Sequence, residues 1–171
     1  INLIIGSRAS GKTKHLIELV NETAKTSKGN VVCIEKGNTL TFDVTSAVKL
    51  CDVDEYGVNG YDAYYGFLCG ICAGNYDITD VFCDATYKIV GEKDFDLIAD
   101  FLERVSALAE DSNVMFTFTL SCDEKDIPDR AFVVSDIGKG VKSIVRRIAE
   151  YRESEREAGV HTKGRSKTEC R

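Results

Sequence analysis

Residues 3–20 read LIIGSRASGKTKHLIELV and contain the most informative pattern of the chain. Eight residues at its centre follow the spacing G-x-x-x-x-G-K-[ST], which is the motif of a phosphate-binding loop. The apolar run Leu3–Ile5 precedes the motif as a short buried strand, and Lys14–Val20 follows it as the first turns of a helix. A strand before the loop and a helix after it are the context that the motif requires. The stretch therefore predicts a phosphate-binding loop formed by Gly6, Ser7, Arg8, Ala9, Ser10, Gly11, Lys12 and Thr13.

The residue types of this motif suit the chemistry of a triphosphate. Gly6 and Gly11 allow the backbone to bend tightly, so that the amides of residues 9–13 point at an oxyanion near the helix N-terminus. The Lys12 ammonium is expected to reach the β- and γ-phosphates, and the Thr13 hydroxyl is expected to bind Mg²⁺. The motif thus predicts binding of a nucleoside triphosphate together with Mg²⁺.

The composition indicates one folded domain and no membrane segment. The chain has 171 residues, of which 43% are hydrophobic, and this is enough for one core. Its longest apolar stretch without charge, Ala63–Tyr76, is too short to cross a bilayer. The seven cysteines are odd in number and lie mostly in apolar runs, and no signal peptide precedes them. This pattern favours reduced thiols and a cytoplasmic location over a disulfide framework.

The charge is distributed unevenly along the chain. Residues 1–138 carry 12 Lys and Arg against 23 Asp and Glu, a balance of −11, whereas residues 139–171 carry 10 against 5, a balance of +5. An acidic body repels the nucleic-acid backbone, so contact with nucleic acid is expected only through the basic C-terminal segment.

Apolar runs and helical stripes alternate along the chain. Strand patterns occur at Leu3–Ile5, Val31–Ile34, Ala47–Val53, Asp80–Asp84, Val114–Leu120 and Ala131–Val134. Helical patterns occur at residues 12–27, Gly60–Gly74, Glu92–Asp111 and from Val141 onward. Such alternation after a phosphate loop predicts a three-layer α/β fold, with a mostly parallel sheet and helices on both faces. We expect a nucleotide-binding domain over residues 1–138, an amphipathic basic helix over 139–157 packed on it, and a disordered polar tail over 158–171.

A carboxylate at the end of a buried strand is a second requirement of Mg²⁺-dependent phosphoryl chemistry. Asp84 fits this requirement because it follows the apolar residues Val81, Phe82 and Cys83, well downstream of Thr13. The alternative is a turn or capping residue at a strand end. Ala85 comes next, so the common Asp-Glu pair in which the glutamate is the base is absent.

Over residues 1–135 the order of the expected elements resembles that of the RecA-like P-loop ATPases. This order is a loop, a helix, a strand ending in Glu, a weaker strand, a helix, a strand ending in Asp, a helix and a strand ending in a polar residue. The resemblance implies that Glu35, which closes the run Val31–Ile34, polarises the attacking water. It also implies that Ser121 contacts the γ-phosphate, and that the nucleotide is ATP. By residue type alone, Glu35 and Ser121 are also ordinary solvated strand ends.

The whole chain also resembles a family of short bacterial P-loop proteins whose function is not established. Stretches such as Tyr76–Asp80 and Phe116–Thr119 carry this resemblance. This resemblance implies nucleotide binding and no particular biological process. A twitching-motility role is not expected, because motility ATPases have a separate N-terminal domain and histidine motifs, and this chain has only His15 and His161.

Three functions are compatible with the sequence. The first is a slow Mg²⁺-dependent ATPase or ATP-dependent switch of RecA-like type. The second is a small-molecule or nucleotide kinase, although no arginine occurs between Arg8 and Arg104 to close a lid on the phosphates. The third is an adaptor that binds nucleotide without hydrolysing it. Phosphate release separates the first from the third, and a phosphorylated acceptor identifies the second.

Two further patterns have ordinary explanations. Cys69 and Cys72 form a C-x-x-C pair inside an apolar helix without a second ligand pair, which favours core packing over a metal or redox site. The aromatic residues within 61–67 are compatible with a buried core and also with the interface of a homo-oligomer. The basic residues near the last helix are compatible with a solvated helix face and also with a surface for another protein partner.

Overall fold

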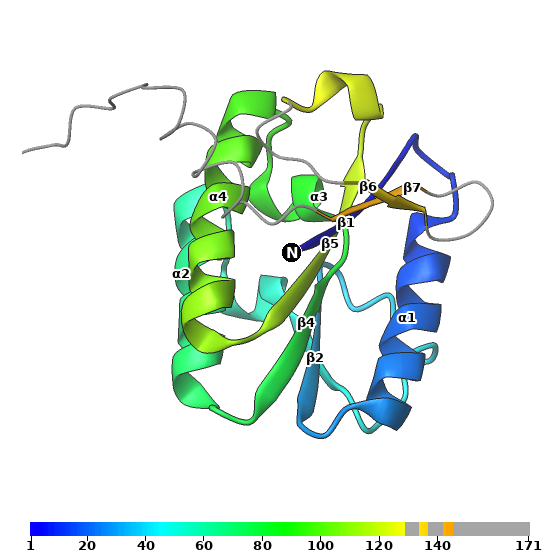
Figure 1. Ribbon diagram of the computed structural model, residues 1–171, viewed down its shortest axis with the longest axis vertical. Helices are drawn as coiled ribbons and strands as arrows, with labels where there is room; N and C mark the ends of the chain where they lie inside the picture. Colours follow the sequence, from blue (N-terminus) through cyan, green and yellow to red (C-terminus); the bar gives the residue numbers. More distant parts are fainter. Residues whose placement is uncertain (129–133, 137–141, 146–171) are drawn as a thin grey trace, which may run out of the picture.

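The computed structural model describes residues 1–128, 134–136 and 142–145. Strands and helices alternate through most of this part of the chain (Figure 1). The strands are β1 (Asn2–Gly6), β2 (Asn30–Glu35), β3 (Lys49–Asp52), β4 (Ile78–Cys83), β5 (Met115–Ser121), β6 (Val134–Asp136) and β7 (Lys142–Val145). The α-helices are α1 (Lys12–Thr26), α2 (Tyr61–Gly74), α3 (Thr86–Val90) and α4 (Phe95–Ser112), and short 3-10 turns lie at Val53–Tyr56 and Glu124–Asp126.

The strands form one sheet in the order β3-β2-β4-β5-β1-β7-β6. The first five of these strands are parallel, and β7 and β6 continue the sheet beyond β1 in antiparallel pairs. Figure 1 shows α1 on one face of the sheet and α2 and α4 on the other. The three-layer α/β fold with a mostly parallel sheet, expected from the alternation of patterns, is therefore confirmed.

Two apolar clusters hold these layers together. The larger lies between the sheet and helices α2 and α4, where the Phe101 ring stacks on Tyr64 at 5.3 Å between centroids and meets Phe118 edge-on at 5.7 Å. The smaller lies under α1, with Leu16 and Val20 fully buried against the other face of the sheet. Burial on both faces explains why the parallel strands are almost continuously apolar in sequence.

The expected helix over residues 139–157 is wrong where the structure describes that range. Lys142–Val145 form β7, which pairs antiparallel with β1 from Asn2↔Val145 to Ile5↔Lys142. The open edge of β1 offers unpaired backbone groups, and a neighbouring strand satisfies them. The rest of 139–157, the expected tail 158–171 and most of the expected strand Ala131–Val134 lie outside the described residues.

Candidate functional site

The carboxyl ends of three neighbouring strands surround the candidate site. Parallel pairing aligns Gly6 of β1 with Ser121 of β5, and Cys83 of β4 with Phe118 of β5. A cavity of about 770 Å³ opens at this edge of the sheet, within the range of small-molecule sites. Its wall comprises Ser7, Arg8, Ala9, Ser10, Gly11, Lys12, Thr13, Asp84, Ala85, Thr86, Tyr87, Lys88, Lys93, Thr119, Ser121, Cys122, Asp123 and Asp126.

The loop between β1 and α1 has the backbone that its glycines predict. A Cβ at Gly6 would collide with the Ser10 hydroxyl in its present position, so the loop packs closely against Gly6. Gly11 has a φ of 86° and Ala9 a φ of 64°, both in the left-handed region. Gly11 precedes α1 without a side-chain cap, and the first turn of α1 holds no acidic residue. The amides at this helix N-terminus are therefore left available for an anion.

Lys12 is the one strongly buried cation of the loop, with 7% of its surface exposed. Its ammonium donates to the Ser7 carbonyl at 2.7 Å and to the Ser10 hydroxyl at 3.4 Å. Burial lowers the pKa of Lys12, and the nearby Asp84 carboxylate and Cys122 thiol oppose that shift. A charged group held by neutral oxygens in this way is suited to bind a stronger acceptor such as phosphate.

Thr13 and Asp84, which are 71 residues apart in sequence, meet beside the loop. The Thr13 hydroxyl lies 3.2 Å from both carboxylate oxygens of Asp84. Asp84 is 6% exposed and receives a further hydrogen bond, at 2.8 Å, from the Thr119 hydroxyl. Within the described part of the chain, no Lys or Arg pairs with this carboxylate. A buried carboxylate that lies next to a hydroxyl and outside a direct ion pair fits Mg²⁺, which takes hard oxygen ligands and uses few protein groups when phosphates supply the others.

Thr119 is a site residue that the sequence analysis missed. Its hydroxyl donates to Asp84 and accepts from the Ala85 amide at 2.8 Å, so it joins β5 to the turn after β4. Ala85 itself has a φ of 50°, which marks a sharp turn directly after the carboxylate. The signal in the sequence was the alternation of Thr117 and Thr119 with apolar residues in β5, because hydroxyls on a buried strand need partners. The partner could not be named without the strand order.

Ser121 lies where the strand pattern predicted, at the end of β5. It is exposed, lines the cavity and stands opposite Gly6 in the parallel register. The next residue, Cys122, lines the same cavity but is buried. The structure thus brings the loop, Thr13, Asp84 and Ser121 to one cavity.

Glu35 is placed differently from these residues. Strand β2 lies next to β4, and the Asp84 amide donates to the Ile34 carbonyl at 2.9 Å, so Glu35 and Asp84 end adjacent strands. Glu35 is 1% exposed and does not line the cavity. Its Oε2 accepts hydrogen bonds from the Thr39 amide at 2.6 Å, the Thr39 hydroxyl at 3.0 Å and the Leu40 amide at 2.9 Å. Its Oε1 is buried and has no hydrogen-bond partner among the residues that the structure describes.

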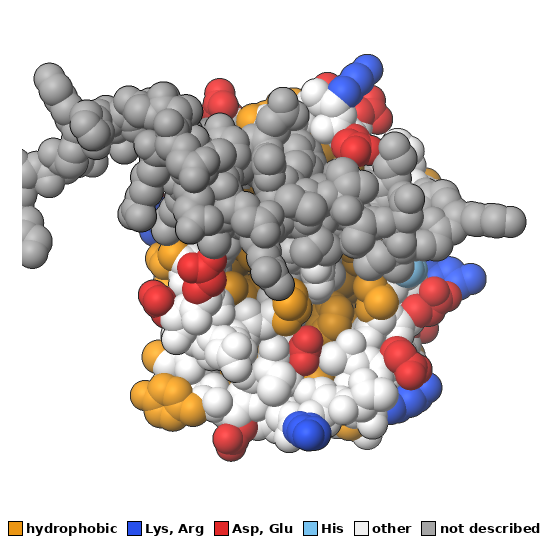
Figure 2. Space-filling view, in the orientation of Figure 1, with side chains coloured by type: hydrophobic (Ala, Val, Ile, Leu, Met, Phe, Trp, Pro, Cys, Tyr) orange, Lys and Arg blue, Asp and Glu red, His pale blue; other side chains and the backbone are white. Residues whose placement is uncertain are grey.

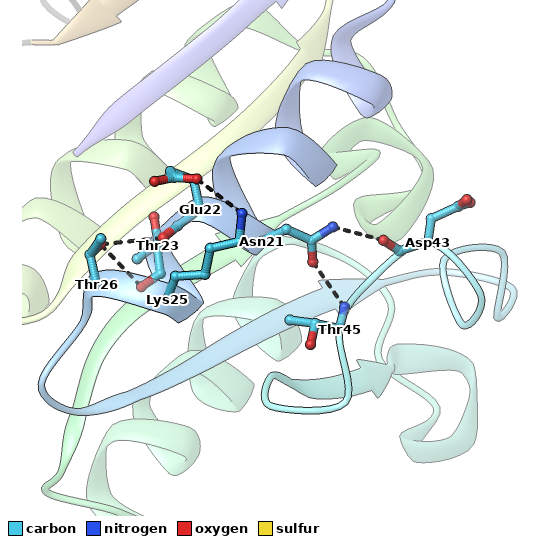
Figure 3. A network of polar contacts seen from close by, with 7 residues as sticks. All are labelled: Asn21, Glu22, Thr23, Lys25, Thr26, Asp43 and Thr45. Atoms are coloured by element: carbon cyan, nitrogen blue, oxygen red, sulfur yellow. Dashed lines mark hydrogen bonds and ion pairs between the residues drawn. The ribbon is translucent and has the colours of Figure 1, made fainter.

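The segment 36–48, between β2 and β3, is held from a second side by α1. The Asn21 amide group donates to the Asp43 carbonyl at 2.8 Å and accepts from the Thr45 amide at 2.9 Å (Figure 3). Asn21 and Glu35 therefore fix opposite sides of one segment. The sequence analysis did not find this pair of anchors, since a single Asn on a helix face has no distinctive pattern.

Several expectations about other sites can be compared with the described residues. Within them, no group of three or more His, Cys, Asp or Glu is placed to hold a metal ion, and Cys69 and Cys72 are free thiols of α2. None of the described helices is both long and apolar enough to span a membrane. Figure 2 shows acidic side chains scattered over the described part of one face, in keeping with the negative balance of residues 1–138.

Comparison with known proteins assigns no family to the chain. No protein-family model matches it, and no curated protein matches it. Among solved structures, the flagellar accessory protein FlaH from Methanocaldococcus jannaschii is similar, with a TM-score of 0.49 and 15% sequence identity. The match covers 84% of this chain and 76% of that chain. Similarity at this level carries no assignment of activity.

Proposed function

We propose that this protein binds ATP with Mg²⁺ and acts as a slow ATPase, or as an ATP-dependent switch, of RecA-like type. The observation that carries the proposal is the meeting of the loop's Thr13 hydroxyl with the buried Asp84 carboxylate, 3.2 Å apart, at the mouth of a glycine-bounded loop. A hydroxyl and a strand-end carboxylate beside a phosphate loop are the metal-holding groups of P-loop nucleotide sites.

The chain's own groups suggest how the triphosphate is bound. The amides of the loop and of the uncapped start of α1 hold the phosphate oxygens. The Lys12 ammonium exchanges the Ser7 carbonyl and the Ser10 hydroxyl for phosphate oxygens, because a charged acceptor makes the stronger hydrogen bond. Thr13 and Asp84 would hold Mg²⁺, which supplies neutralisation of charge on the β- and γ-phosphates when it is bound. Ser121, on the exposed end of β5, is the proposed contact to the γ-phosphate.

Glu35 is the proposed group that orients the attacking water and accepts its proton, through the Oε1 that has no partner in the described structure. Its position behind the cavity wall argues for slow turnover. Oε2 is engaged by Thr39 and Leu40, so a Glu35 carboxylate that turns towards the phosphates gives up three hydrogen bonds. The same arrangement also supports a switch, in which the bound nucleotide is retained rather than hydrolysed quickly.

The test is binding of a fluorescent ATP analogue with and without Mg²⁺, with phosphate release followed in the same sample. Lys12→Ala is expected to abolish binding. Lys14→Ala is the matched control, because Lys14 is exposed on the same helical turn and does not line the cavity. Slow phosphate release that Glu35→Gln abolishes would support the ATPase, whereas tight binding without release would support the switch. Absence of Lys12-dependent binding would refute the proposal.

A further inference from the structure

The cavity wall contains two lysines outside the phosphate loop. Lys88 comes from α3 and Lys93 from the turn before α4, and the carboxylates of Asp84, Asp123 and Asp126 line the same cavity. Lys93 makes no ion pair within the described part of the chain. Its ammonium lies 5.5 Å from the centre of the Phe95 ring and 5.9 Å from that of the Tyr87 ring. The Lys93 side chain is exposed and lies near these rings, which do not neutralise its charge.

The turn that carries Lys93 is fixed on both sides. Gly91 ends α3 with a φ of 81°, and a Cβ there would approach the Asn59 side chain to 2.9 Å. Asp94 caps α4 by accepting from the amides of residues 96 and 97, both at 2.9 Å. The Tyr61 hydroxyl donates to the Asp94 carbonyl at 3.4 Å. The position of Lys93 in the cavity wall is therefore built into the fold and does not depend on a free loop.

Lys93 and Lys12 both lie near Cys122, at the end of β5. Burial raises the pKa of the Cys122 thiol and the Asp126 carboxylate raises it further, whereas the hydrogen bond with Tyr87 and the ammonium groups of Lys93 and Lys12 lower it. Cys122 lines the cavity directly after Ser121 at the end of β5. Lys12 of the loop and Lys93 of the turn before α4 therefore line the same cavity near this end of β5, together with Asp126.

We propose that Lys93 contacts the terminal phosphate of the bound nucleoside triphosphate, as a second cation supplied by the same chain on the side opposite Lys12. The inference rests on the proposed function and adds a residue to that site. Charge on the γ-phosphoryl oxygens is what such a site has to stabilise, and a fixed cation in a partly enclosed cavity does so effectively. The sequence has no arginine between Arg8 and Arg104 for this purpose.

The experiment compares the affinities of ADP and of the non-hydrolysable ATP analogue AMP-PNP, both with Mg²⁺, by calorimetry. Lys93→Met keeps an unbranched apolar side chain over the two rings and removes the charge. We expect AMP-PNP to bind about tenfold more weakly to this variant and ADP to bind within about twofold of the wild type, because ADP lacks the contacted group. Lys93→Arg should restore most of the lost affinity. Lys28→Met is the matched control, since Lys28 is exposed beyond the C-terminal end of α1 and does not line the cavity.

The outcomes separate this inference from the proposed function. Equal weakening of ADP and AMP-PNP in Lys93→Met, or no change in either, would overturn the role of Lys93 while leaving Lys12-dependent binding in place. A failure of Lys93→Arg to recover affinity would also contradict a charge contact. Failure of the wild type to bind either nucleotide would overturn both proposals.

Discussion

Replacement of Glu35 by Ala and by Gln separates its two proposed roles. Alanine removes the acceptor of three hydrogen bonds to Thr39 and Leu40. The Leu40 residue is buried, so its amide loses its partner without gaining water, at a cost of about 1–3 kcal/mol. Thr39 is exposed, and each of its two bonds is worth about 0.5–1.5 kcal/mol. We therefore expect Glu35→Ala to lower the free energy of unfolding by about 3 kcal/mol, a large part of a typical 5–15 kcal/mol.

Glutamine should be much less harmful to stability. The three donors all bind Oε2, and Oε1 has no partner in the described part of the chain, so the amide oxygen of Gln can occupy the Oε2 position with its nitrogen at Oε1. Neutral bonds replace charge-assisted ones, and the expected loss is about 1 kcal/mol. If Oε1 orients the attacking water, Glu35→Gln should nevertheless abolish phosphate release, since the amide cannot accept a proton.

The assay is urea unfolding followed by far-UV circular dichroism, with hydrogen exchange of the Thr39 and Leu40 amides as the local readout. Exchange of these two amides should accelerate strongly in Glu35→Ala and only slightly in Glu35→Gln. Equal destabilisation by both substitutions, or a loss below about 1 kcal/mol in Glu35→Ala, would contradict the anchoring role deduced from the geometry.

Three further outcomes follow from the same contacts. Thr119→Val preserves shape but leaves the amide after Asp84 without its acceptor, so we expect a loss of about 1–3 kcal/mol in urea unfolding, and weaker dependence of nucleotide affinity on Mg²⁺. Asn21→Ala should speed hydrogen exchange across residues 36–48 while nucleotide affinity stays within about twofold, because Asn21 anchors that segment far from the cavity wall. The free energy of unfolding should fall as pH rises from about 9 to 12. The reason is that burial raises the pKa values of Cys83 and Tyr61 to about 12, above their unfolded values of 9.0 and 10.0. An alkaline stability profile that stays flat would contradict this linkage.

The sequence by itself determined the features that depend on neighbours along the chain. The phosphate loop could be located because its eight residues are contiguous and its glycines, lysine and threonine act at fixed offsets. The α/β class followed from apolar runs that alternate with helical stripes, because burial of one helix face or of a whole strand leaves a periodic trace. The clearest stripe, Glu92–Asp111, corresponds to α4 (Phe95–Ser112).

Only the tertiary structure decided which distant residues meet. The contact of Thr13 and Thr119 with Asp84 depends on the strand order, which sets β5 between β1 and β4. The same is true of β7: the apolar spacing near residues 141–148 suits a helix, but pairing with the open edge of β1 makes residues 142–145 a strand. Local periodicity cannot represent an edge that is formed by residues more than a hundred positions away, so this element and the full set of site contacts were determined by packing.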